Sequence, residues 1–210
     1  MNGLPEPLIY NVWRMENLLA LGIGISLASV AGVRAFTPLA LAALFAALGL
    51  FALPLPYVVV GGDGWWWSVF GALAGLAVVE IALDKLAMLD RAFNYAMVPV
   101  RVFAGAMLFT AALGFGLDAG SLPWLAAGGV IAALVAVLKV VLRPSAKAAS
   151  AGVSPAFLSF FEDVVALVGG TLGYFVPLVP LVLVAFLLYF YYRVRRRRGR
   201  KYGGLRILGD

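Results

Sequence analysis

The chain has 210 residues, of which 64% are hydrophobic and only 12% are charged, and its mean hydropathy is +1.02. A soluble domain of this size has too little polar surface to cover so many apolar side chains, which excludes a water-soluble protein. The absence of His and Cys also excludes disulfides, thiolate nucleophiles, Ser-His-Asp triads and zinc sites built from Cys or His. We therefore expect an all-α integral membrane protein, a polytopic helical bundle with no metal and no cofactor.

The first part of the chain contains a polar lead-in, residues 1–16, and then two short apolar runs, 18–33 and 38–53. Each run has 16 residues, about 24 Å of helix against a hydrocarbon core of ~30 Å. The runs are therefore predicted to be short or broken membrane helices. The break between them is expected at Gly32, Arg34 and Pro38.

The rest of the apolar sequence is long enough for ordinary membrane spans. Three runs match the ~20 residues that a span needs, at 65–83, 97–117 and 122–142. The last apolar region, 160–192, is too long for one span, and Pro177 and Pro180 interrupt it. We interpret it as two helices or a kinked pair, which gives a transmembrane domain at 17–192 with six or seven membrane segments.

The positions of Lys and Arg predict how the chain is oriented in the membrane. Cations occur in the predicted loops 84–96 and 143–159 and in the tail 193–210, whereas the loops 54–64 and 118–121 carry none. Cytoplasmic loops carry an excess of Lys and Arg, and one alternation of spans puts all the cationic segments on that side. The C-terminus is therefore expected in the cytoplasm.

The basic tail directly follows three tyrosines, Tyr189, Tyr191 and Tyr192, at the end of the last apolar run. An aromatic belt followed by cations is typical of a chain leaving a membrane, so membrane lipids with anionic headgroups are the expected partners and nucleic acid is not. The predicted headgroup-binding residues are Arg193, Arg195, Arg196, Arg197 and Arg198.

The apolar runs contain an apparent repeat in which the charges are inverted. Glu80 and Asp84 correspond to Lys139 and Arg143 at a constant offset of 59, and both pairs are followed by a loop and another apolar helix. This indicates a duplicated hairpin, at 65–117 and 122–176. After the loops the signs are again opposite, with Arg101 in the first copy and Glu162 and Asp163 in the second.

Charges inside apolar runs need an explanation, because one charge at the bilayer centre costs ~2.5 to 3.5 kcal/mol even on insertion scales. Pairing between the hairpins would neutralise them, so we predict contacts of Glu80 and Asp84 with Lys139 or Arg143, and of Arg101 with Glu162 or Asp163. The alternative is that these groups lie at helix ends and reach water. The predicted polar cluster comprises Arg34, Glu80, Asp84, Lys85, Arg101, Lys139, Arg143, Glu162 and Asp163.

Small residues recur every four positions in several of the runs, a spacing that lets membrane helices approach closely. The series are Gly24, Ala28 and Gly32, then Gly71 and Gly75, then Gly128, Ala132 and Ala136, then Gly169 and Gly173. Ordinary packing within the chain explains them, and the sequence leaves open whether the protein forms a homo-oligomer.

Three segments resemble a bacterial membrane family catalogued as domain of unknown function 4126. They are G-I-S-L-A-S-V-A-G-V-R-A-F-T-P-L at 24–39, V-E-I-A-L-D-K at 79–85 and S-F-F-E-D-V-V-A-L at 159–167, and the resemblance covers about residues 16–195. It implies a multi-helix protein of the bacterial cytoplasmic (inner) membrane, with no established biochemical role. The family's landmarks would fall on Gly32, Arg34, Glu80, Asp84, Lys85, Glu162 and Asp163.

The intramembrane charges, the apparent duplication and the broken first helix favour a small carrier or channel for protons, ions or a small charged solute. The alternative is a membrane scaffold or accessory subunit that transports nothing, in which the charges form a structural salt-bridge network. No nucleotide-binding, hydrolase or metalloprotease motif occurs, and a lipid-modifying enzyme with Glu or Asp as base would lack a nucleophile or metal set. We therefore do not expect an enzyme.

Overall fold

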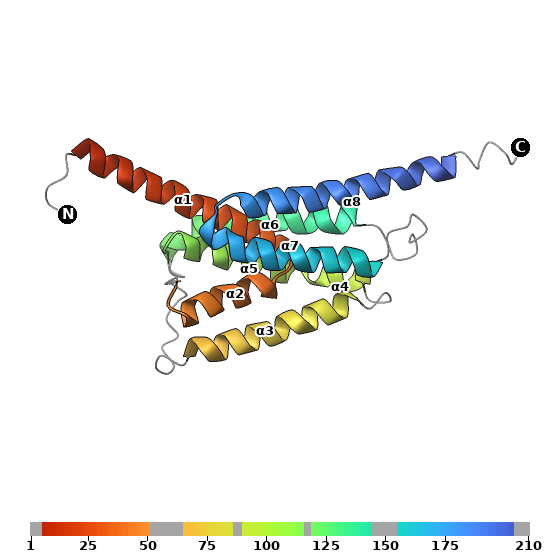
Figure 1. The fold of residues 1–210 in the computed structure, drawn as a ribbon, viewed down its shortest axis with the longest axis horizontal. Helices are drawn as coiled ribbons and strands as arrows, with labels where there is room; N and C mark the ends of the chain where they lie inside the picture. The colour runs from red at the N-terminus through yellow and green to blue at the C-terminus, as the bar shows by residue number, and fades with distance from the viewer. Residues whose placement is uncertain (1–5, 51–64, 86–89, 116–118, 144–154, 204–210) are drawn as a thin grey trace, which may run out of the picture.

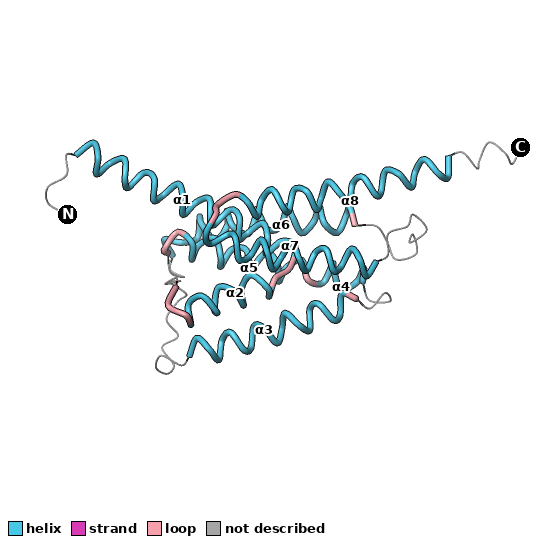
Figure 2. Tube along the Cα trace, viewed as in Figure 1, coloured by secondary structure: helices cyan, strands magenta, loops and turns pink. Residues whose placement is uncertain are grey.

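The computed structural model describes residues 6–50, 65–85, 90–115, 119–143 and 155–203, and these ranges contain helices and no strand (Figure 2). The helices are α1 (Glu6–Val33), α2 (Phe36–Ala47), α3 (Trp65–Asp84), α4 (Asp90–Ala96), α5 (Val98–Ala112), the short 3-10 helix η1 (Ala119–Ser121), α6 (Leu122–Leu142), α7 (Pro155–Phe175) and α8 (Val179–Gly203).

Four helices of the described part are long and apolar enough to cross a membrane: Glu16–Val33 within α1, α3, α6 and, within α7, Phe157–Phe175. The described part of the protein is thus all-helical and of membrane type. In addition α2 and α5 are shorter apolar helices, and α8 begins with an apolar stretch that continues directly into the Arg-rich tail. The total of six or seven segments and the internal repeat remain predictions.

The predicted helix boundaries agree well for α3 and α6, and the helices on either side of Pro177 are separate, as the sequence indicates. Two predicted runs are too long, because α2 ends at Ala47 instead of 53 and α5 ends at Ala112 instead of 117. The reason is the same in both. A glycine with positive φ follows each helix, Gly49 (φ 67°) and Gly114 (φ 77°), and this left-handed residue ends a helix while the apolar pattern continues.

Helix α1 lies at the centre of the bundle and packs against α5, α6, α7 and α8. Glycines allow this close approach. A Cβ atom on Gly32 would lie 2.6 Å from the Cβ of Val135 and 2.7 Å from the carbonyl oxygen of Ala132, both on α6. Gly71 on α3, by contrast, has open space beside it. The predicted small-residue contact through Gly32 is therefore confirmed, and it joins α1 to α6.

The junction of α1 and α2 lies inside the bundle and does not reach the end where α3 and α6 stop (Figure 1). Arg34 and Ala35, the two residues between the helices, are both completely buried. Helix α2 has 12 residues, about 18 Å, and turns back toward the end from which α1 enters. The pair α1 and α2 therefore forms a helical hairpin inside the bundle, which we call the α1–α2 hairpin, and Arg34 is its tip.

The outer parts of α1 and α8 extend beyond the bundle at opposite ends (Figure 1). Helix α1 begins at Glu6, so most of the predicted polar lead-in is helical, whereas residues 1–5 lie outside the described part. Helix α8 likewise continues through the first part of the basic tail, to Gly203, and residues 204–210 lie outside the described part. The C-terminal ends of α3, α6 and α8, each of which carries or is directly followed by Lys or Arg, lie at one end of the bundle, as the charge pattern predicts.

Candidate functional site: a buried charge network at a helix break

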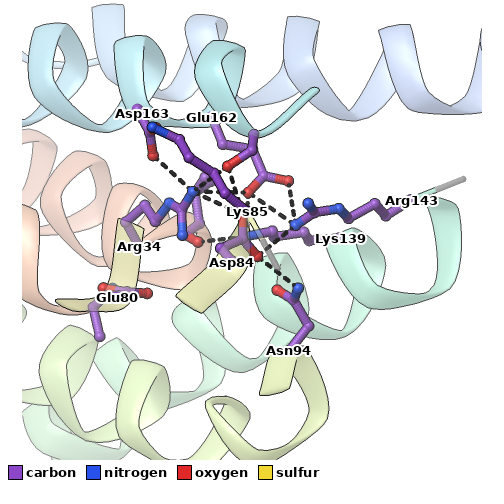
Figure 3. Close-up of polar contacts among 12 residues, drawn as sticks. Arg34, Glu80, Asp84, Lys85, Asn94, Lys139, Arg143, Glu162 and Asp163 are labelled. Carbon is purple, nitrogen blue, oxygen red and sulfur yellow. Dashed lines mark hydrogen bonds and ion pairs between the residues drawn. The ribbon is translucent and has the colours of Figure 1, made fainter. Parts of the chain in front are cut away.

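Eight charged side chains from α3, α5, α6, α7 and the α1–α2 junction meet inside the bundle, and we call them the charge network (Figure 3). They comprise four cations, Arg34, Arg101, Lys139 and Arg143, and four carboxylates, Glu80, Asp84, Glu162 and Asp163, so their formal charges sum to zero. The side chains of Arg34, Arg101, Lys139 and Glu162 are 0% exposed. Even the most exposed member, Asp163, has a side chain only 15% exposed.

The break between α1 and α2 creates the first requirement for these charges. A helix end leaves backbone carbonyls or amides without partners, and in a membrane no water replaces them. The N-cap residue of α2, Ala35, has no side-chain hydrogen bond to offer. The partners for both helix ends therefore have to come from elsewhere in the chain.

Glu80 and Lys139 supply these partners from opposite sides. The Glu80 carboxylate accepts hydrogen bonds from the backbone N–H groups of Ala35 (3.3 Å) and Phe36 (3.1 Å), at the start of α2. The Lys139 ammonium donates to the carbonyl oxygen of Val33 (2.8 Å), at the end of α1. Each charge has the sign that the adjacent helix dipole favours, negative at an N-terminus and positive at a C-terminus.

Arg34 pairs with carboxylates of α3 and α7 through a single nitrogen. Its Nη2 lies 2.8 Å from Oδ2 of Asp84 and 2.6 Å from Oδ1 of Asp163, and it donates to the hydroxyl of Ser159 at 3.1 Å. The Ser159 hydroxyl in turn donates to Asp84 at 2.9 Å. The tip of the hairpin is thus held by two helices that follow it in the chain.

Glu162 is the carboxylate shared by the cations of α6. Its Oε2 lies 2.7 Å from Nζ of Lys139, and its Oε1 lies 3.1 Å from Nη1 of Arg143. Tyr191 on α8 donates its hydroxyl to the same carboxylate. Arg143 lies just beyond the end of α6. Burial alone would lower the pKa of its guanidinium, but the carboxylates of Glu162 and Asp84 outweigh burial and raise this pKa above its ordinary value, so Arg143 stays charged.

Arg101 on α5 belongs to the part of the network around Glu80. Its Nη2 donates to the side-chain oxygen of Asn94 at 3.0 Å and lies 3.6 Å from Oε1 of Glu80. The Asn94 amide donates to Asp84 at 2.8 Å. Asn94, on the short helix α4, therefore connects the two halves of the network.

The buried guanidinium groups of Arg34 and Arg101 each have two nitrogens without a hydrogen-bond partner among the described residues. They are Nε and Nη1 of Arg34 and Nε and Nη1 of Arg101. These are all donors, since a guanidinium has no acceptor. Arg34 and Arg101 therefore each keep two donor nitrogens for which the described part of the chain supplies no acceptor.

The predicted pairings are partly right. Asp84 pairs with Arg143 at 2.9 Å, as the repeat predicts. The predicted pairing of Glu80 with a cation of α6 is wrong, because Glu80 contacts the start of α2 and Arg101. The predicted pairing of Arg101 with Glu162 or Asp163 is also wrong, because Arg101 contacts Glu80 and Asn94 instead. The predicted repeat selects the charges but does not specify which of them meet.

Two predicted residues have other roles than expected. Lys85 lies at the rim, with a side chain that is 48% exposed and 3.8 Å from Asp163, as the helix-end alternative predicts. Pro38 occupies the first turn of α2, where a proline leaves the helix intact, and the break itself falls at Arg34 and Ala35.

Sequence reasoning missed Asn94, Ser159 and Tyr191. Asn94 and Ser159 carry no charge, so the cost argument did not select them. Tyr191 was assigned to the aromatic belt, but it is 0% exposed, whereas Tyr189 and Tyr192 are 56% and 46% exposed. Its spacing from Leu187 and Val194 places all three on one buried helix face, a signal present in the sequence.

The described arginines of the tail, Arg193, Arg195 and Arg196, are not among the eight residues of the charge network. Arg193, Arg195 and Arg196 are exposed on α8, and Arg195 donates to the carbonyl oxygen of Val141 at the end of α6. The side chains of Arg197 and Arg198 lie outside the described part of the chain. The exposed arginines follow the apolar part of α8, where the aromatic and basic pattern predicts a membrane surface.

No curated protein and no solved structure matches the chain. The model of one family matches residues 20–197, which include the whole charge network and most of the chain. The protein therefore belongs to the family described as domain of unknown function (DUF4126).

Proposed function

We propose that the protein is a small membrane carrier for an ion or a small charged solute, with the charge network as its polar centre. The observation that carries this proposal is the position of the network: eight charges meet around the tip of the α1–α2 hairpin, inside the bundle. Broken helices whose ends point at charged groups within the bilayer are typical of the binding sites of secondary transporters.

The energetic cost of the network supports a role beyond stability. Buried ion pairs are rarely more stable than well-packed apolar residues of the same volume, and each intramembrane charge adds an insertion cost of ~2.5 to 3.5 kcal/mol. A bundle that needed only to be stable would place apolar residues at Arg34, Lys139 and Glu162. Ionisable groups at such depth usually serve a substrate or ion pathway.

In such a carrier, an arrangement whose central side chains are buried would be the occluded state. Access then requires that the hairpin tip separate from α3 or α7, whose carboxylates hold Arg34. The turn between α7 and α8 is coupled to α1, because the backbone N–H of Leu178 donates to the Ser26 hydroxyl at 3.0 Å.

The second candidate is a membrane scaffold that transports nothing, and one observation favours it: the charges balance and are closed on one another. In that case the network holds the α1–α2 hairpin in place. Neutralising a charge would then lower stability and change no flux.

The test is charge neutralisation followed by flux measurements in proteoliposomes. Concentration jumps of sodium, potassium, chloride, sulfate, lactate and pyruvate are applied to the reconstituted protein on a solid-supported membrane, and the resulting current is recorded. A pH-sensitive dye inside the proteoliposomes reports proton movement. We expect a current with at least one probe, which Arg34→Gln and Glu162→Gln abolish and which Glu16→Gln, at an exposed position, preserves. The scaffold would be established instead if the wild type gives no current with any probe and the neutralised variants are only less stable than the wild type.

The orientation and the lipid contacts belong to the same proposal. We place the protein in the bacterial inner membrane with its C-terminus in the cytoplasm and its tail on anionic headgroups, because the C-terminal ends of α3, α6 and α8, which carry or precede Lys and Arg, share one end of the bundle. The chain has no cysteine, so single cysteines introduced at Lys85 and Trp67 report sidedness without background. If an impermeant reagent labels a cysteine at position 85 from outside intact cells, the proposed orientation is wrong and the C-terminus lies outside.

A further inference from the structure

The start of α2 holds a carboxylate in a way that resembles a binding site more than a salt bridge. The two oxygens of Glu80 contact two successive backbone N–H groups, those of Ala35 and Phe36, and Oε1 also faces Arg101. Two amides at a helix N-terminus together with a guanidinium are a common anion-binding arrangement. Here the anion is supplied by the chain itself, from α3.

Glu80 fills this arrangement incompletely. Its oxygen lies 3.6 Å from Nη2 of Arg101, beyond hydrogen-bond distance, and the amide of Ala35 is bonded at a long 3.3 Å. The Nε and Nη1 atoms of Arg101 have no partner, although the side chain is 0% exposed. A guanidinium binds a carboxylate best through two nitrogens, which Glu80 does not achieve.

The neighbouring arginine adds donors on the same side. Arg34 follows directly after α1, and all of its contacts go through Nη2, so its Nε and Nη1 also remain without partners. Figure 3 shows Glu80 on the other side of Arg34 from Asp163, apart from the carboxylates that Arg34 contacts. Buried donors without partners are costly, so this region favours an additional acceptor.

We infer that the break between α1 and α2 is a binding site for a small carboxylate anion, and that Glu80 occupies the site while it holds no ligand. The incoming carboxylate competes with Glu80 for the amides of Ala35 and Phe36 and engages the free nitrogens of Arg101. A free ligand adjusts its position to the guanidinium, which a side chain tethered to α3 cannot do. The inference rests on the proposed carrier function only for the identity of the cargo, because binding is measurable without transport.

The binding test removes the tethered carboxylate and supplies a free one. Glu80→Ala in detergent is expected to have a lowered Tm, which sodium formate or acetate raises by about 3 °C or more. Sodium chloride at the same ionic strength is the control and should give no such rise. The double variant Glu80→Ala with Arg101→Gln should lose the response, and the wild type, whose site is occupied by Glu80, should respond less than Glu80→Ala.

Each outcome of this experiment decides the inference. Equal shifts with formate and chloride would overturn the carboxylate class, and the absence of any shift would overturn the site. If Glu80→Ala does not fold with or without formate, Glu80→Gln takes its place, because it keeps an oxygen for the amides and leaves Arg101 without a countercharge. A formate shift no larger in Glu80→Gln than in the wild type would then refute the site.

The flux measurements in proteoliposomes separate this inference from the proposed function. A pyruvate or lactate current in the wild type that Arg101→Gln abolishes supports both. A formate shift in Glu80→Ala without flux of any probe leaves the binding site in place and refutes the carrier. A sodium, potassium or proton flux without a formate shift keeps the carrier and refutes the carboxylate site.

Discussion

Replacing Lys139 by Met removes one charge from the centre of the network with little change in volume. The ammonium lies 2.7 Å from Glu162 and donates to the carbonyl of Val33 at 2.8 Å, and the side chain is 0% exposed. Lys139→Met therefore leaves an uncompensated negative charge in the network and a helix end without its partner. Both losses occur where water cannot compensate for them.

The expected magnitude follows from these contacts. Breaking a buried ion pair by removing one partner costs about 3 to 5 kcal/mol. Glu162 keeps Arg143 as a partner at 3.1 Å, so we expect the lower part of this range, about 3 kcal/mol. For a chain of this length, 1 kcal/mol corresponds to about 2 to 4 °C in Tm, which gives a fall of about 6 to 12 °C.

The assay is thermal unfolding of the purified protein in detergent micelles, with tryptophan fluorescence as the readout. The matched control is Lys85→Met, because Lys85 is 48% exposed and lies 3.8 Å from Asp163, and its change should stay within about 0.5 kcal/mol. The double variant Lys139→Met with Glu162→Gln should be more stable than the sum of the single changes predicts, by about 1 kcal/mol or more. Equal stability of Lys139→Met and Lys85→Met would refute the reasoning.

Three further predictions concern other parts of the bundle. Tyr191→Phe should cost about 1 to 2 kcal/mol, because the hydroxyl bonded to Glu162 is lost, whereas Tyr189→Phe at an exposed site should change nothing; the two Tm values decide this. Gly32→Ala should destabilise by about 1 to 3 kcal/mol through its clash with α6, whereas Gly71→Ala, with open space beside it, should be neutral or stabilising, and a harmless Gly32→Ala would disprove the close approach. Finally, neutralising the exposed arginines of the tail should weaken retention of anionic lipid by about 1 kcal/mol for each cation, as native mass spectrometry with phosphatidylglycerol would report; unchanged retention would exclude a headgroup role for Arg193, Arg195 and Arg196.

The sequence predicts the helices and the members of the network well. Apolar runs determine where the membrane helices lie, and the bounds of α6 agree to the residue. The charges could be selected because a buried charge is costly wherever it occurs, so Arg34, Arg101 and Glu162 stand out without any knowledge of the fold.

The partners of these charges could not be predicted, because they depend on how the helices are arranged. Glu80 contacts backbone amides of α2, and an amide has no sequence signature. The polar residues Asn94 and Ser159 bridge charges only because α4 and α7 bring them there. The lengths of α2 and α5, by contrast, were readable from Gly49 and Gly114, which end the helices although the apolar pattern continues.

The order in which the chain is synthesised makes the α1–α2 hairpin a late product of biogenesis. The hairpin leaves the ribosome before its partners, because the residue that caps the end of α1 follows 106 positions after Val33, and the cap of α2 follows 45 positions after Ala35. Until α3 and α7 have been synthesised, Arg34 lacks its two closest carboxylate partners, Asp84 and Asp163. We therefore expect a chain truncated before α3, whose Arg34 has no countercharge, to be a substrate of membrane quality-control proteases.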